Sequence, residues 1–394
     1  MDSNDIEKER GITILSKCTS ISWKEFMINI IDTPGHSDFG SEVERILRMV
    51  DGALVIVDSL EGVMPQTKFV IKKALENRKK IFVFFNKVDR LKADSLEELE
   101  EVSKNVMNEM MDLVFEINPD AIEFPVFFGS GRDGYASKNL KKVFNKEVNN
   151  IHEILDEIIE YIQPPKVENS NLQLLTSMID LDEYFGKLLI GKLYGGTIKV
   201  GQNVISLSQD GKKKESFRVN KMFGFKGVKK YEIEEAFAGQ IVCISGCEKS
   251  TIGDMITDSE STPIIEAPII DPPTLSVIFS ANNSPLAGKD GTHLTIRKIK
   301  DRLLKEAETN PGISIKELGE TMEVKGRGEL QLSILMENMR REGFEFMVTA
   351  PNILIKEENG QRLEPLEKVF LDIPLEYSGT IISKMESRGG KLLD

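Results

Sequence analysis

The stretch INIIDTPGHSDFGSEVER, residues 28–45, combines residue types that can handle a metal-bound phosphate. A short apolar run ends in Asp32, a Pro-Gly turn follows at once, and His36 stands directly after the turn. A carboxylate at such a point can hold a hydrated Mg²⁺. The backbone N–H of Gly35 can approach a terminal phosphate because no side chain blocks it, and His36 could orient an attacking water. The alternative is that DTPG forms only a tight turn.

The tetrapeptide NKVD, residues 86–89, adds a second candidate site. Guanine presents an N1–H beside an exocyclic amine, and the carboxylate of Asp89 can accept both bonds, which adenine cannot supply. A base that does not supply this pair of donors leaves the carboxylate unpaired, which costs roughly 1–3 kcal/mol or more of binding free energy. Asn86 would tie the loop to the base edge, and the stem of Lys87 would cover a base face. Thr13, which ends RGIT, offers a hydroxyl that can complete Mg²⁺ coordination.

The first part of the chain is predicted to alternate strands and helices. Apolar runs typical of buried parallel strands occupy residues 26–31, 53–57, 81–85 and 125–128. Amphipathic helices are predicted over residues 41–50, 66–77, 96–115 and 151–162. This order indicates an α/β doubly wound domain, whose ligands bind at the carboxyl ends of the strands. The polar residues at these ends are expected to share one sheet edge: Asp32, Asp58, Asn86 and Ser130.

The pattern changes after QPPK, residues 163–166. Short strands with Gly-rich turns over residues 172–261 predict an antiparallel β-barrel, and a Pro-rich linker leads into a small α+β domain. A strand, KVFLDIPLE, and a helix, GTIISKMESRG, then begin a further domain that they cannot complete, because one strand and one helix bury too little surface. The predicted domains are residues 1–165, 166–265, 266–358 and 359–394.

The composition limits the class of protein. No run of about 18 apolar residues predicts a membrane span, and three cysteines in 394 residues favour a reducing compartment. Cys243 and Cys247 lack the histidines or second cysteine pair of a zinc site, so a packing role is favoured. The net charge of −13 opposes general nucleic-acid affinity. RNA contacts would need local basic patches, for which the candidates are residues 212–214 with Arg218, 226–230 and 340–341.

Taken together, these stretches resemble the translational GTPases, and most closely the TypA/BipA family of ribosome-associated factors. The resemblance is carried by DSNDIEKERGITI, DTPGHSDFGSEVER, VDSLEGVMPQTKFV, NKVDR and GRGELQLSILMENMRREGFE, and it covers essentially the whole chain. HSDFGSEVERIL and ENMRREGFE favour this family over elongation factor G or LepA. The direct passage from the α+β domain into EPLEKVFLDI, with no intervening domain, favours it too.

The resemblance implies a GTP site with Mg²⁺. Thr13 would be the threonine of switch I that binds Mg²⁺, and Asp32 would also serve the metal. Gly35 would serve the γ-phosphate of GTP, and His36 would be the catalytic histidine of switch II.

The resemblance also implies how the base is read: Asn86, Lys87 and Asp89 would recognise guanine. In GSGR, residues 129–132, Ser130 matches the family, whereas Gly131 replaces the usual Ala and would keep the backbone N–H to the guanine oxygen. Arg132 stands where the family has Leu or Lys, and it is a departure from the pattern.

The implied fold is an incomplete P-loop-type GTPase domain, followed by a barrel like domain II of translation factors. A ferredoxin-like α+β domain like domain III and the start of a domain like domain V would complete the chain. The phosphate-loop pattern G-x-x-x-x-G-K-[ST] does not occur in the sequence, whereas the family carries it upstream of DSNDIEKERG, after the first strand. The strands that end at Asp32 and begin near Ala53 would then leave their inner edges unpaired. We therefore expect these 394 residues alone to bind GTP weakly or not at all.

Two origins fit the sequence: an incomplete copy of an intact factor, truncated at both ends, or a natural remnant that keeps binding surfaces without hydrolysis. The leading functional hypothesis is a cytoplasmic enzyme of stress responses that hydrolyses GTP to GDP with Mg²⁺. It would act on the ribosome, contacting rRNA and ribosomal proteins, and would be a monomer off the ribosome with no membrane partner. The alternative is a non-catalytic ribosome- or RNA-binding module built from the barrel and α+β domains.

Overall fold

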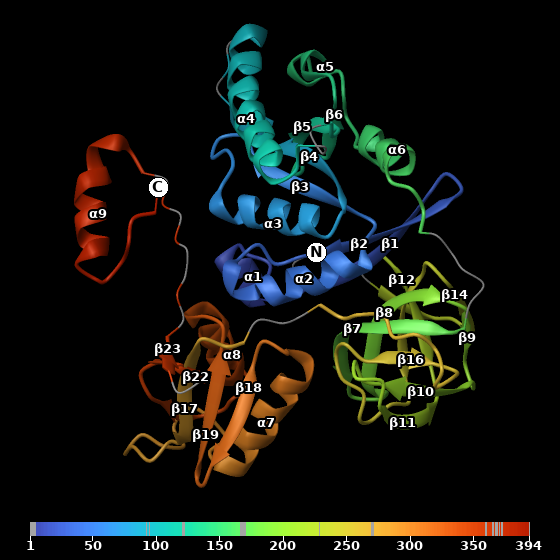
Figure 1. Ribbon diagram of the computed structural model, residues 1–394, viewed down its shortest axis with the longest axis vertical. Coiled ribbons are helices and arrows are strands. Elements are labelled where there is room, and N and C mark those ends of the chain that lie inside the picture. The colour runs from blue at the N-terminus through green and yellow to red at the C-terminus, as the bar shows by residue number, and fades with distance from the viewer. Residues whose placement is uncertain are drawn as a thin grey trace. The chain divides into compact units, whose positions relative to one another are not determined.

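The computed structural model describes residues 5–91, 93, 95–119, 123–165, 171–227, 229–268, 272–358, 361–364, 366, 369, 371 and 373–393. These residues fall into two compact units, Met1–Ile355 and Lys356–Asp394 (Figure 1). Three predictions fall partly outside the described residues: the domain boundary at residue 166, the linker around residues 269–271, and much of the strand at 368–376.

A four-stranded sheet lies near the centre of the first part of the chain. Its order is β3 (Gly52–Asp58), β4 (Lys80–Asn86), β5 (Val126–Ser130) and β6 (Tyr135–Ser137), with β3, β4 and β5 parallel. The strands therefore form as the apolar runs predict.

Helices pack on both faces of this sheet, and successive residues of a strand contact helices on opposite faces. Val83 and Phe85 of β4 belong to the core cluster that includes Ile71 of α3 and Met110 of α4. The neighbouring residue Phe84 belongs to a second cluster with side chains of α6, because successive strand residues point to opposite faces. The helices are α3 (Pro65–Glu76), α4 (Leu96–Ile117), α5 (Leu140–Phe144) and α6 (His152–Tyr161), of which only α5 lies outside the predicted ranges.

The strand predicted at residues 26–31 differs from expectation. β2 (Phe26–Asp32) pairs antiparallel with β1 (Lys17–Trp23) in a separate two-stranded sheet, so it is neither parallel nor buried along its length. Its hydrogen bonds go to β1, and in the part of the chain that the structure describes no strand joins its other edge. β3 likewise has β4 as its one strand partner among these residues, as the sequence predicts for both inner edges. Leu54 and Ile56 of β3 are consequently 38% and 58% exposed.

A barrel-like antiparallel sheet follows. Its eight strands run in the order β11-β10-β16-β7-β8-β15-β12-β13. Their bounds are β7 (Gln173–Asp182), β8 (Gly186–Gly195), β10 (Asn203–Leu207), β11 (Lys213–Arg218), β12 (Met222–Lys226), β13 (Lys229–Glu232), β15 (Ile241–Ser245) and β16 (Met255–Thr257). β9 (Thr197–Lys199) and β14 (Glu235–Phe237) form a separate pair. Burial raises the pKa of the Cys243 and Cys247 thiols to about 12, so both are inert packing residues.

The third sheet is antiparallel, with the order β18-β19-β17-β20 and with β21 (Asn352–Ile353) paired to β17. Along the chain β17 (Leu275–Ala281) leads to α7 (Ile296–Thr309), β18 (Ser314–Leu318), β19 (Thr321–Gly326), α8 (Glu329–Arg341) and β20 (Phe346–Val348). Phe279, Leu303 and Leu335 pack in one core. The two helices and the antiparallel sheet agree with the predicted small α+β domain.

The unit Lys356–Asp394 contains a short hairpin and a helix. β22 (Lys356–Glu358) pairs with β23 (Gln361–Leu363), and α9 (Ser378–Glu386) overlaps the predicted helical stretch. The predicted strand at 368–376 is wrong at its end, because Leu375–Tyr377 form the short helix η4. α9 buries none of its residues, as expected for one helix with so few partners. Of the described helices, none has the length and apolar character to cross a membrane.

Candidate functional site

Three of the four predicted strand ends meet at one edge of the sheet. Asp58 at the end of β3 stands in register with Asn86 at the end of β4, and β5 ends at Ser130 beside them. Asp32 does not belong to this edge, because β2 pairs with β1 in the separate sheet, where Asp32 stands opposite Lys17. The prediction of a single shared edge is therefore wrong for Asp32.

Asn86 joins the loops that follow β4 and β5. Its Oδ1 atom accepts the backbone N–H groups of Lys87 and Gly131, each at 2.8 Å. Lys87 adopts a left-handed conformation with φ of 65°, which is unusual for a residue with a side chain and is often found at functional sites. Asn86 therefore ties its own loop to the loop after β5, whereas its contact with a base edge stays a prediction.

The ammonium of Lys87 pairs with Asp58. Burial alone would raise the pKa of Asp58, but hydrogen bonds from Lys87 and from the backbone N–H of Leu60 lower it below its ordinary value. The stem of Lys87 therefore extends along the strand ends, with its charged group held by a neighbouring carboxylate.

Asp89 lies in the short helix η2 (Val88–Arg90), and its side chain is 16% exposed. Its Oδ2 atom is 3.2 Å from Nη2 of Arg132, which is 70% exposed and also bonds Asp133 at 2.9 and 3.1 Å. Exposed ion pairs of this kind are typically worth about 0–1 kcal/mol. The contact with Arg132 therefore contributes little to holding the Asp89 carboxylate in place.

His36 and Gly35 lie between β2 and the helix α2 (Gly40–Met49). Gly35 is exposed, and a Cβ atom there would meet no atom within 4 Å among the described residues. Nδ1 of His36 accepts the backbone N–H of Asp38 at 3.2 Å. The Oδ1 atom of Asp38 lies 3.4 Å from the same nitrogen, so both of these contacts engage the Nδ1 side of the ring.

The segment around Thr13 is held by Glu7, a residue that sequence reasoning missed. Glu7 is buried in α1 (Asp5–Arg10), and its Oε1 atom accepts the backbone N–H groups of Ile14 and Leu15 at 3.0 and 3.1 Å. Its other oxygen pairs with Lys17. A buried carboxylate with these partners fixes the path of the chain at Thr13, although nothing in the local pattern EKERG indicates this role.

The donors near this segment suit Mg²⁺ rather than a metal that prefers nitrogen or sulfur. Among the described residues no group of three or more His, Cys, Asp or Glu side chains is arranged to hold a metal ion. Mg²⁺ usually takes only one or two protein oxygens and fills its other positions with phosphate and water. Thr13 and Asp32 offer one hydroxyl and one carboxylate, which fits that requirement.

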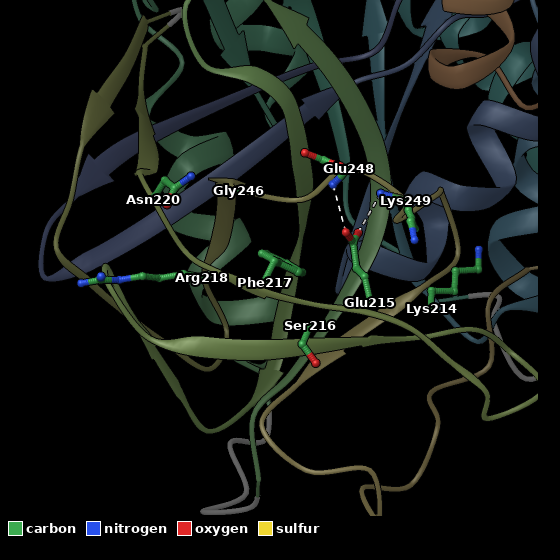
Figure 2. A pocket seen from close by; sticks show the side chains of 9 residues that line it. All are labelled: Lys214, Glu215, Ser216, Phe217, Arg218, Asn220, Gly246, Glu248 and Lys249. Carbon is green, nitrogen blue, oxygen red and sulfur yellow. Dashed lines mark hydrogen bonds between the residues drawn. The ribbon is translucent and has the colours of Figure 1, made fainter.

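A cavity of about 510 Å³ lies on the barrel-like sheet, away from the predicted site residues. Figure 2 shows Glu215 in its centre, where its carboxylate accepts the backbone N–H groups of Glu248 and Lys249 at 3.1 and 2.9 Å. Lys214 in its lining is 2.8 Å from Asp254, and Nε of Arg218 donates to the carbonyl of Gly201. The cavity is therefore mixed in charge, and both Lys214 and Arg218 already have partners.

Several residues of the remaining basic patches form ion pairs within the chain. Lys212 and Lys213 pair with Asp210 and Glu260, and Lys230 pairs with Asp180. Arg340 and Arg341 both pair with Glu337. In the described part of the chain these lysines and arginines therefore offer little free positive charge to a phosphate backbone.

Two models of known domains match the chain. The GTP-binding domain of elongation factor Tu matches residues 1–164, and domain 2 of elongation factor Tu matches residues 186–257. A GTP-binding domain of this type followed by this second domain defines the class of translational GTPases.

Comparison with curated relatives identifies a family within this class. The chain is 44% identical over 400 residues to the large ribosomal subunit assembly factor BipA of Bacillus subtilis, 41% over 403 residues to that of Synechocystis, and 38% over 397 residues to that of Escherichia coli. Each match covers all of this chain but 63%, 65% and 63% of the relative, so the chain spans slightly less than two thirds of their length. The chain belongs to the TypA/BipA family of translational GTPases.

Proposed function

We propose that this chain is the greater part of a ribosome-associated GTPase, which binds GTP with Mg²⁺ and hydrolyses it to GDP on the ribosome. The proposal rests on Asn86, whose Oδ1 atom accepts the backbone N–H groups of Lys87 and Gly131 beside the carboxylate of Asp89. This arrangement lies at the carboxyl edge of parallel strands, where such sheets bind ligands. It places the carboxylate of Asp89 and the side chain of Asn86 directly after the end of β4.

Each site residue then has a role that its position allows. Asp89 accepts the N1–H and the amine of guanine, while the backbone N–H of Ser130 donates to the guanine oxygen. Gly131 stays bonded to Asn86 and holds its loop beside the base, and Lys87 lies along a base face. Thr13 and Asp32 hold Mg²⁺, which when bound neutralises charge on the phosphate oxygens. Gly35 donates its N–H to the γ-phosphate.

The catalytic role falls to His36. Because Asp38 engages Nδ1, the Nε2–H of His36 points a hydrogen bond at a water and aligns it for attack on the γ-phosphate. Residues 7–15 and 32–44 would be ordered by GTP and released after hydrolysis, as in other nucleotide switches.

We assign the partners and the domains from the same resemblance. The relatives are named as assembly factors of the large ribosomal subunit, and we propose that this chain contacts rRNA and ribosomal proteins and is a cytoplasmic monomer off the ribosome. We also propose four domains, at residues 1–165, 166–265, 266–358 and 359–394. The third is ferredoxin-like, since its β-α-β-β-α-β order and strand order are those of that fold.

The alternative is a ribosome- or RNA-binding module without catalysis. Such a module would need a basic surface to bind RNA. Five of the candidate basic residues instead pair with carboxylates of the chain: Lys212, Lys213, Lys230, Arg340 and Arg341. The retention of Asp32, His36 and Asp89 also favours the enzyme.

Sedimentation with large ribosomal subunits separates the two functions. The comparison uses the 394-residue chain and an extended chain, in which the phosphate-loop segment of a family member is joined ahead of Met1. We expect a non-hydrolysable GTP analogue to increase binding of the extended chain about tenfold over GDP, because GTP orders the segments that face the ribosome. Equal binding of both chains with GTP analogue, with GDP and without nucleotide would establish the non-catalytic module instead.

A further inference from the structure

The helix α8 begins without a cap of its own. Its N-cap residue is Gly328, which has no side chain to accept the free N–H groups of the first turn. The N–H groups of Leu330 and Gln331 instead donate to Oδ2 of Asp38, at 3.0 and 3.2 Å. Asp38 lies in the short helix η1 (Ser37–Phe39), 292 residues before Leu330. A carboxylate from one part of the chain thus caps a helix of another.

The approach of Asp38 to α8 depends on the glycine. A Cβ atom built at Gly328 would lie 2.1 Å from Oδ2 of Asp38, which no real side chain tolerates. The backbone of Gly328 is extended, with φ of −157°, so any residue could adopt its conformation. Space for Asp38, rather than backbone freedom, is therefore the reason for glycine at this point.

The same aspartate also holds His36. Its backbone N–H donates to Nδ1 of His36 at 3.2 Å, and its Oδ1 atom is 3.4 Å from that nitrogen. One oxygen of Asp38 thus faces α8 and the other faces the imidazole. The ring of His36 also meets the edge of Phe39, with centroids 6.4 Å apart.

Apolar and charged contacts extend this junction to the segment around Thr13. Ile6, Ile14, Phe39 and Ile334 form one buried cluster, drawn from α1, the segment after it, η1 and α8. Arg341, at the other end of α8, pairs with Glu9 of α1. α8 is therefore in contact with both segments that carry predicted nucleotide ligands.

We propose that Asp38 is a positioning residue, which links the amino end of α8 to the imidazole of His36. A displacement of α8 then moves the carboxylate, and the carboxylate moves the ring that faces the water. The effect of Asp38 on catalysis rests on the proposed GTPase function. Its contacts with α8 and with His36 do not require a bound nucleotide.

Hydrogen exchange of the nucleotide-free 394-residue chain tests the capping half of the link. In Asp38→Ala and in Gly328→Ala we expect the amides of residues 329–333 to exchange about tenfold faster or more, because the first turn of α8 loses its acceptor. Asp38→Asn keeps an acceptor oxygen and is expected to stay within about threefold of the unchanged chain. Ser95→Ala is the matched control, since Ser95 caps α4 through the N–H of Glu98 at 3.2 Å, and it should affect only that helix.

The imidazole signals of His36 in NMR spectra test the positioning half. Gly328 is not among the contacts of His36, yet we expect Gly328→Ala to shift these signals as Asp38→Ala does, while Ser95→Ala leaves them in place. If Gly328→Ala speeds exchange in α8 without moving the His36 signals, Asp38 is only a helix cap and the proposal is wrong. If Asp38→Ala unfolds, Gly328→Ala still decides the question, because Gly328 meets Asp38 and not the imidazole.

Hydrolysis by the extended chain separates this proposal from the proposed function. We expect Asp38→Ala to lower kcat about tenfold with KM for GTP unchanged, because Asp38 touches His36 but not the nucleotide ligands. An extended chain that hydrolyses no GTP at all would overturn the proposed function and leave the exchange and NMR results standing.

Discussion

A polypeptide of these 394 residues alone is expected to bind GDP and GTP about 10³- to 10⁶-fold more weakly than the extended chain. The pattern of a phosphate-binding loop does not occur within these residues. Such a loop supplies backbone N–H groups and a lysine to the phosphates. Three charge-assisted bonds at about 1.5–3 kcal/mol each amount to roughly 5–9 kcal/mol.

Isothermal titration of both chains with GDP and GTP measures this difference. The control is the extended chain with its loop lysine replaced by alanine, which should fall back toward the 394-residue chain. Sub-micromolar binding by the 394 residues alone would show that the base and magnesium ligands suffice without the loop.

In the extended chain, His36→Ala is expected to lower ribosome-stimulated kcat by roughly 10²- to 10⁴-fold, the usual range for a positioned acid–base or water-orienting group. Nucleotide affinity should stay within about threefold, because the ring faces the attacking water rather than the base or the metal. Single-turnover hydrolysis on ribosomes and titration with GDP measure the two quantities separately.

His152→Ala is the matched control for this variant. His152 begins α6 and its ring contacts Trp23, with centroids 4.7 Å apart, so its loss should leave hydrolysis unchanged. Ribosome-stimulated turnover that is the same in His36→Ala and His152→Ala would remove His36 from the mechanism.

Much of the fold follows from local patterns. The strands β3, β4 and β5 follow from apolar runs because parallel strands are buried on both faces, and α3, α4 and α6 follow from helical periodicity. β1 was not predicted, since KCTSISW alternates small polar residues and its strand forms only by pairing with β2. The direction of β2 could not be read from its own residues either, because an apolar run does not specify its partner.

The candidate site was predictable where the chemistry lies within a short motif. The motif NKVD predicts that Asn86 ties its loop, and the structure adds the partner Gly131, since both loops follow neighbouring parallel strands. The roles of Glu7 and Asp38 were not predictable, because each depends on contacts that form only when folding brings distant partners together. Asp38 meets α8 across 292 residues, and no spacing in the sequence records that contact.

The base preference of the extended chain tests the central claim, which is that Asp89 reads guanine at the carboxyl edge of the parallel strands. Asp89→Asn replaces an acceptor oxygen with an amide donor, which suits the O2 carbonyl of xanthine instead of the guanine amine. Competition titrations with GDP, XDP and ADP are expected to show that Asp89→Asn weakens GDP binding by about 10²-fold or more and reverses the preference toward XDP. An unaltered preference for GDP in Asp89→Asn, or ADP binding equal to GDP binding in the extended chain itself, would contradict the account.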